Sequence, residues 1–198
     1  MSSGSQSSPM QVHQRKRGFQ EMKATGIVRR IDDLGRVVVP KEIRRTLRIR
    51  EGDPLEIFVD REGEVILKKY SPINELSEFA QEYAHALFDS LGQKILVTDR
   101  DEIIAIAGAS KKEYLNKNIG KEIESSMDKR EGKVEKNEST VEIVEGKEET
   151  VSSYLIQPIV SNGDPVGSVI MLMDKGSLTD VEVKVCQAAA NFLARQME

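Results

Sequence analysis

Between residues 22 and 70, short apolar runs alternate with turn-forming residues, which is typical of a small β-rich unit. The turn Asp32-Asp33-Leu34-Gly35 joins the first two runs, and Pro40 ends the second one. Residues 41–47 follow Pro40 and predict a short helix. Strands are expected at residues 25–31, 36–39, 55–59 and 65–67, which either alternate apolar and polar residues or are rich in β-branched ones. The pattern predicts two hairpins separated by one short helix.

This first unit is too small to form a core on its own. Chains near its size bury only roughly 60% of their surface, and smaller ones usually depend on a metal, disulfides or a partner chain. Residues 22–70 contain no cysteine and no histidine, which excludes the first two solutions. We therefore expect hairpins from two chains to interdigitate. The apolar side chains that they would share are Ile27, Val37, Val39, Ile43, Leu47, Leu55, Ile57 and Ile66.

Residues 72–198 predict a second, larger unit that contains both helices and strands. Ser71 and Pro72 are suited to begin a helix, and apolar residues then recur every three or four positions as far as Gly92. We expect one amphipathic helix over residues 72–91. Strands are expected at residues 94–99, 103–107, 140–144, 151–159 and 166–173.

Two further helices and a loop complete the second unit. Residues 110–115 predict a short helix that continues toward Met127, and the charged stretch 129–138 predicts a mobile loop. After Ser177, residues 178–197 predict a long closing helix. Its apolar positions alternate four and three apart, as in a two-heptad seam, at Val181, Val185, Ala188 and Phe192.

Charge separates along the chain, although the net charge of the whole is only −4. Residues 22–70 hold 12 basic and 9 acidic side chains, for a net charge of +3. Residues 71–198 hold 14 and 23, for a net charge of −9. This separation indicates two bodies with different partners. The basic body is a candidate for binding a phosphate backbone, and the acidic body is not.

Basic side chains of the first unit form the candidate nucleic-acid site, because cations spaced along a surface displace counterions from DNA. They are Lys23, Arg29, Arg30, Arg36, Lys41, Arg44 and Arg45. Nearby carboxylates leave open that some of them are ordinary solvated charges. Asp32 and Asp33 are interpreted as turn residues, because two carboxylates without further ligands are weak evidence for a metal. The short helix favours readout of DNA shape rather than a strict base code.

No catalytic residue set assembles, so we expect neither enzymatic activity nor a cofactor or metal. Cys186 is single and is expected to pack as a small apolar residue. Apolar runs stay well below the roughly 18 residues of a membrane span, which predicts a cytoplasmic protein without a membrane partner. Residues 1–21 are polar, and we expect a disordered leader or upstream extension there.

The first unit resembles the AbrB-type transition-state regulators. The resemblance is carried by four runs, TGIVR at 25–29, DDLGRVVVP at 32–40, EIRRTL at 42–47 and GDPLEI at 52–57. It implies a swapped-hairpin β-barrel of two chains over residues 22–71, which binds double-stranded DNA and regulates transcription of sporulation genes in the forespore. The DNA-contacting arginines of the family correspond to Arg29, Arg36, Arg44 and Arg45.

The second unit, residues 72–198, is similar to a GAF-type sensory domain in the order of its elements. This similarity implies an antiparallel sheet with flanking helices, pairing of chains through helices 72–91 and 178–197, and a homotetramer. It also implies an unidentified small-molecule effector between the middle sheet and residues 108–131. A domain that serves only oligomerisation is the open alternative. For the whole chain, the alternative is an antitoxin-like protein-binding module that shares the barrel type.

Overall fold

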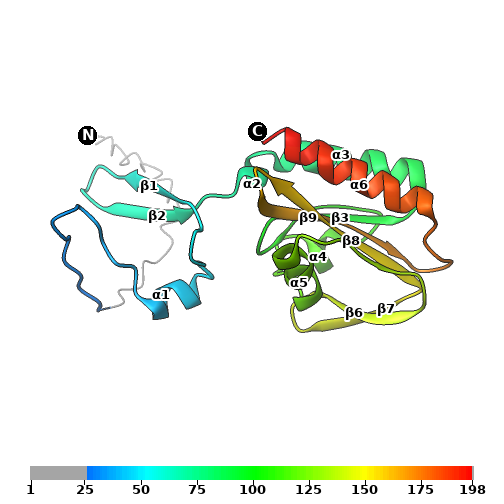
Figure 1. Ribbon diagram of the computed structural model, residues 1–198, viewed down its shortest axis with the longest axis horizontal. Helices are drawn as coiled ribbons and strands as arrows, with labels where there is room; N and C mark the ends of the chain where they lie inside the picture. Colours follow the sequence, from blue (N-terminus) through cyan, green and yellow to red (C-terminus); the bar gives the residue numbers. More distant parts are fainter. Residues whose placement is uncertain (1–25, 198) are drawn as a thin grey trace, which may run out of the picture. The chain divides into compact units, whose positions relative to one another are not determined.

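The computed structural model describes residues 26–197 of the chain. The chain divides into two compact units, Met1–Ile43 and Arg44–Glu198. The first unit predicted from the sequence, residues 22–70, spans the boundary between them; the name first unit is kept for residues 22–70 and the name larger unit for residues 72–198. The expectation for residues 1–21 and the candidate contact Lys23 lie outside the described residues. The fold is α+β, with helices and antiparallel sheets in the larger unit (Figure 1).

In the first unit, extended chain lies on both sides of a tight turn. The Asp32 N–H donates to the Arg36 carbonyl at 3.0 Å, and Gly35 has a φ of +76°, so the predicted turn is confirmed. The strands predicted at 25–31 and 36–39 are wrong for the single chain, because residues 26–39 contain no strand. The reason is that the described chain offers them no neighbouring strand with which to pair.

A short helix and a hairpin follow, much as predicted. They are α1 (Lys41–Thr46), β1 (Leu55–Val59) and β2 (Val65–Lys69). The two strands are antiparallel, with Leu55 opposite Lys69 and Val59 opposite Val65. Leu47, one of the apolar side chains that two chains would share, is exposed in the single chain. The hairpin therefore forms locally, whereas its apolar side chains lack a core.

A five-stranded antiparallel sheet is the centre of the larger unit, in the order β4-β3-β9-β8-β5. Its strands are β3 (Lys94–Thr98), β4 (Ile103–Ala107), β5 (Lys133–Glu135), β8 (Ser153–Ser161) and β9 (Asp164–Met173). A separate hairpin consists of β6 (Ser139–Val144) and β7 (Lys147–Val151). The helices are α2 (Pro72–Glu75), α3 (Ser77–Leu91), α4 (Lys111–Tyr114), α5 (Lys121–Lys129) and α6 (Asp180–Arg195).

Several predicted boundaries in this unit need correction. The helix expected over 72–91 is interrupted at Leu76, whose φ of −98° and ψ of 19° leave the α-region between α2 and α3. The short helix from Ser110 ends at Tyr114 instead of continuing toward Met127, and α5 begins anew at Lys121. The loop expected over 129–138 contains β5, which pairs with β8.

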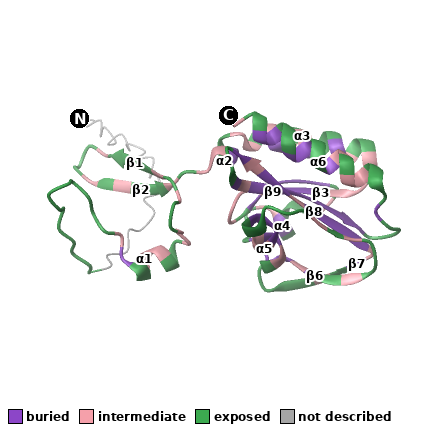
Figure 2. Ribbon diagram, in the orientation of Figure 1, coloured by how far each residue is buried: buried purple, intermediate pink, exposed green. Residues whose placement is uncertain are grey.

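Two apolar layers enclose the sheet. Alternate residues of each strand point to opposite faces, so Val97 and Met171 pack beneath α3 and α6, whereas Leu96 and Ile170 pack against α4, α5 and the β6–β7 hairpin. Figure 2 shows the buried residues concentrated on β3, β8 and β9 between these layers. The larger unit therefore has a core within a single chain, which the segment before α1 lacks.

Candidate nucleic-acid interface

The candidate arginines of the first unit lie beside its turn. Arg29 and Arg30 are exposed on the extended segment before the turn, and Arg36 directly follows it. The side chain of Arg36 is 69% exposed. These three guanidinium groups are accessible, as contact with a phosphate backbone requires.

One of these arginines is held in place by a carboxylate. Asp32 Oδ2 accepts a hydrogen bond from Arg36 Nε at 2.8 Å, and Asp32 Oδ1 accepts from the backbone N–H groups of Leu34 at 3.0 Å and Arg36 at 2.8 Å. Hydrogen bonds from the backbone and then the side chain of Arg36 lower the pKa of Asp32 below its ordinary 3.8. The carboxylate is therefore ionised at any pH near neutrality.

The remaining candidates lie on α1. Lys41 is its first residue and is exposed, and Arg44 and Arg45 form its last turn. Residues three and four apart are neighbours on a helix surface, so the three cations share one side of α1. Arg45 is exposed, whereas Arg44 is half-buried, and its Nε is buried without a hydrogen-bond partner among the described residues. Cations also suit the last turn because of the helix dipole.

This set of cations can bind a polyanion, and an arginine fork can also bond the major-groove edge of guanine.

Within residues 26–197, no group of three or more His, Cys, Asp or Glu could hold a metal ion. In that same range, no helix is long and apolar enough to cross a membrane.

Exposed apolar side chains accompany the cations. Val37 is 53% exposed and Ile57 is 67% exposed, although both are β-branched residues of the kind that normally lines a core. The other large apolar residues exposed between 26 and 70 are Ile27, Val28, Ile31, Leu34, Val38, Leu47, Phe58, Val59, Val65, Leu67 and Tyr70. A soluble monomer rarely leaves so many large apolar side chains in water.

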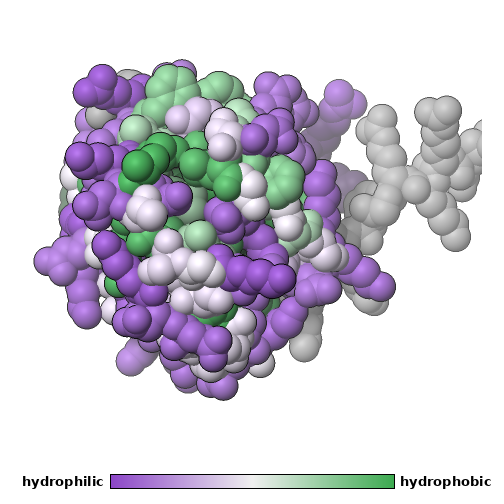
Figure 3. All heavy atoms as spheres, turned by 90° about the vertical axis from the view of Figure 1, so that its right-hand side faces the viewer, coloured by the Kyte–Doolittle hydropathy of each residue, from purple (hydrophilic) through white to green (hydrophobic). Residues whose placement is uncertain are grey.

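The larger unit has an exposed apolar stripe on its helical layer. Phe192 of α6 lies against two aromatic rings of α3, with ring centroids 5.8 Å from Phe79 and 5.4 Å from Tyr83. The predicted seam continues along α6 through Ala188 and Val181, both exposed. Figure 3 shows apolar side chains gathered in the upper part of the face where α3 ends and α6 begins.

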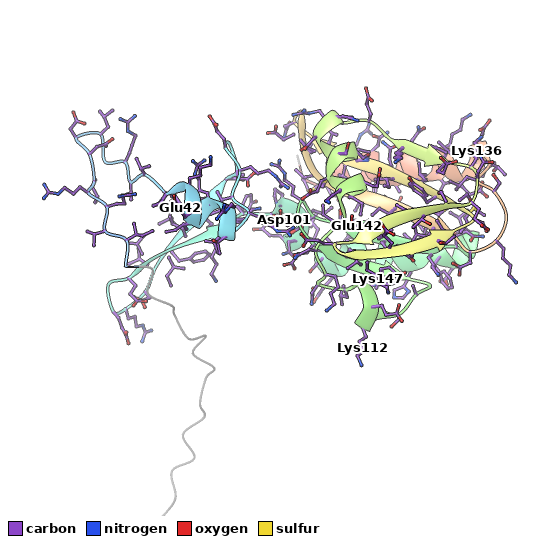
Figure 4. All side chains as sticks on the ribbon, turned by 90° about the horizontal axis from the view of Figure 1, so that it is seen from below. Glu42, Asp101, Lys112, Lys136, Glu142 and Lys147 are labelled. Atoms are coloured by element: carbon purple, nitrogen blue, oxygen red, sulfur yellow. The ribbon has the colours of Figure 1, made fainter. Side chains whose placement is uncertain are left out.

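The opposite side of the sheet contains polar groups that sequence reasoning missed. The buried Tyr114 donates its hydroxyl to Glu149 at 2.7 Å, and burial raises the pKa of that phenol. Lys147 lies 5.3 Å from the centroid of the Tyr114 ring and pairs with Glu113 at 3.1 Å. Figure 4 labels Lys147 at the β6–β7 hairpin. No sequence spacing links these groups, because they come from α4 and from a hairpin more than thirty residues later.

Cys186 belongs to α6 and is buried in the apolar layer between this helix and the sheet, as expected for a small apolar residue. Burial raises the pKa of its thiol to about 12, so the thiol stays neutral and is not a nucleophile.

Comparison with known proteins places the chain in a family. A family model described as stage V sporulation protein T C-terminal, transcription factor, matches residues 75–198. The chain belongs to the stage V sporulation protein T family. The stage V sporulation protein T of Bacillus subtilis (strain 168) is 62% identical over 177 residues, which cover 89% of this chain and 99% of that protein.

The two parts of this family member also have separate relatives. The transition state regulatory protein AbrB of Bacillus subtilis is 67% identical over 51 residues, which cover 26% of this chain and 52% of that protein. A model described as antidote-toxin recognition MazE, bacterial antitoxin, matches residues 28–75. The GAF domain of a phosphoenolpyruvate-protein phosphotransferase from Coxiella burnetii has a TM-score of 0.51 at 17% identity, over 62% of this chain and 82% of that one. The predicted AbrB-type and GAF-type parts are confirmed.

Proposed function

We propose that this member of the stage V sporulation protein T family regulates transcription of sporulation genes by binding double-stranded DNA through a two-chain barrel. The observation that carries the proposal is the coincidence, within residues 26–70, of exposed arginines and exposed apolar side chains. Pairing of two chains would remove the apolar set from water and place two copies of each arginine on one surface. Its place of action would be the forespore cytoplasm.

Replacing Arg36 or Arg44 by alanine tests this surface. Each substitution removes one cation per chain, so each is expected to weaken DNA binding by about 1 kcal/mol or more and to make its salt dependence shallower. A gel-shift salt series on the full chain measures both quantities. Arg61→Ala, in the turn between β1 and β2, is the matched control and should change affinity little. Unchanged binding by both Arg36→Ala and Arg44→Ala would refute the assigned surface.

We also propose that the GAF-type unit joins two such dimers into a homotetramer through α3 and α6. The stripe formed by Phe79, Tyr83, Ala188, Phe192 and Val181 supports this role, because it is apolar and partly open to water within a single chain. The proposed barrel interface uses different residues. A tetramer built from two such dimers requires two separate interfaces per chain.

Substitution of Ala188 by glutamate is expected to break the tetramer into dimers, because it places a carboxylate in the middle of the stripe. Gln187→Glu is the control, since it adds the same charge one residue earlier on the polar side of α6. Analytical ultracentrifugation should give a halved mass for Ala188→Glu alone. A tetramer that survives this substitution would rule out the stripe as an interface.

An unidentified small molecule is the proposed effector of the GAF-type unit. It would bind between the sheet and residues 108–131, beside the buried apolar layer that includes Ile123 and Met127. Binding could alter DNA affinity only if the effector bound two arrangements of the helices unequally. Mass spectrometry of small molecules carried by the purified protein tests for its presence.

An antitoxin-like role is the second candidate, because the MazE model matches residues 28–75. In that role the same barrel would bind a toxin as well as DNA. The extensive fold of residues 72–197 is unlike the short tail expected of an antitoxin. Recovery of one small toxin in stoichiometric complex with the purified chain would favour this candidate over a dedicated regulator.

A further inference from the structure

The two carboxylate oxygens of Asp32 accept hydrogen bonds from different groups. Oδ1 accepts from the backbone N–H groups of Leu34 and Arg36, and so fixes the turn. Oδ2 is left for the side chain of Arg36, whose Nε donates to it at 2.8 Å. The sequence alone predicts only the bonds of Oδ1, because Asp is common in turns for its backbone bonds.

The pairing through Nε determines which part of the guanidinium faces outward. Arginine has five N–H donors in a rigid fork, and one of them lies on Nε. In the part of the chain that the structure describes, no other residue bonds to the terminal nitrogens of Arg36. Both terminal nitrogens therefore remain available as a pair, and this is the edge that makes two parallel bonds to a phosphate or to guanine.

We propose that Asp32 is a positioning residue for DNA binding, which holds Arg36 by Nε and presents its two terminal nitrogens to the DNA. The proposal rests on the proposed function, in which Arg36 contacts DNA. The backbone bonds matter here, because an exposed ion pair by itself holds a side chain only weakly. Asp32 is anchored by two backbone N–H groups, one of which belongs to Arg36 itself.

The direction in which DNA affinity changes when the Asp32 carboxylate is removed distinguishes a positioning role from that of an ordinary solvated charge. A carboxylate near a DNA surface repels phosphates, so its removal should tighten binding if charge alone counts. If Asp32 positions Arg36, its removal should weaken binding. Asp32→Asn keeps an acceptor for the backbone bonds, and it loses the negative charge and the carboxylate oxygen that faces Nε. Asp33→Asn removes the same charge from the same turn, where Asp33 is exposed.

The test measures DNA affinity of the full chain with a duplex selected from a random pool by the unaltered protein. Asp32→Asn is expected to bind about fivefold more weakly, a fraction of what a bidentate arginine contact contributes. Asp33→Asn should bind equally or more tightly. Asp32→Ser, which can still accept from the backbone, should weaken binding as Asp32→Asn does. Thermal melting of each variant reports whether the turn remains folded.

A double-mutant cycle with Arg36→Ala completes the test. Once Arg36 is absent, Asp32→Asn should no longer weaken DNA binding. If Asp32 only stabilised the turn, Asp32→Asn would weaken binding even in the absence of Arg36. If Arg36→Ala weakens binding but Asp32→Asn tightens it, the positioning role is wrong and the assigned surface stands. If Arg36→Ala leaves binding unchanged, the surface itself is wrong, and the role of Asp32 falls with it.

Discussion

An aspartate in place of Val37 is expected to leave the chain unable to form its proposed barrel or to bind DNA. Val37 is 53% exposed in the single chain but belongs to the apolar set that two chains would share. Burial of an unpaired carboxylate costs at least about 3 kcal/mol at each site. Because a dimer contains two such sites, its dissociation constant should rise by well over a hundredfold. Sedimentation and gel shift on the full chain measure both losses.

Arg61→Asp provides the control for this experiment, because it changes charge at an exposed turn between β1 and β2. It should preserve association through the barrel. The GAF-type unit of Val37→Asp should remain folded, since its core is complete within one chain. A Val37→Asp chain that still associates through residues 26–70 and binds DNA would refute the shared barrel.

Gly167→Ala is expected to lower the free energy of unfolding of the larger unit by roughly 3 kcal/mol, near the upper end of overpacking costs. A Cβ at Gly167 would lie 2.0 Å from the Thr98 carbonyl oxygen. Thr98 is the last residue of β3, which pairs with β9. The backbones at Thr98 and Gly167 therefore cannot move apart without breaking hydrogen bonds of the sheet. Denaturant unfolding monitored by circular dichroism gives the change.

The neighbouring residue, Ser168, supplies a control substitution that should not lower stability. Ser168 is fully buried, and its hydroxyl has no hydrogen-bond partner among the described residues. Loss of an unsatisfied buried hydroxyl removes a desolvation cost, so Ser168→Ala should leave stability unchanged or slightly higher. Equal destabilisation by both substitutions would mean that β9 tolerates no change here, and that the close approach at Gly167 is not the cause.

The sequence was informative wherever structure depends on neighbours in the chain. The hairpin of β1 and β2, the strands β3 and β4 and the closing helix follow from local alternation, turn residues and helical periodicity. Likewise, the candidate cations could be named because charge belongs to residue type. Their relation to Asp32 could not, since it depends on which carboxylate oxygen meets Nε.

Elements that depend on distant partners were missed. The three residues of β5, Lys133–Glu135, are mostly charged and form a strand only because β8 lies beside them. The strands expected before α1 fail in the single chain for the converse reason, because nothing in the described chain pairs with them. Propensity therefore indicates which segments can be extended, and tertiary or quaternary neighbours decide which become strands.

If two chains pair as proposed, burial of the exposed apolar residues makes the stability of the first unit depend on the protein concentration. A segment whose core forms only on dimerisation unfolds when the protein is diluted, whereas the GAF-type unit has its core within one chain and does not. In the proposed arrangement, occupancy of DNA would then rise more steeply than linearly with protein concentration, through mass action alone. A threshold of this kind would let a gradual build-up of the regulator produce an abrupt onset of gene control.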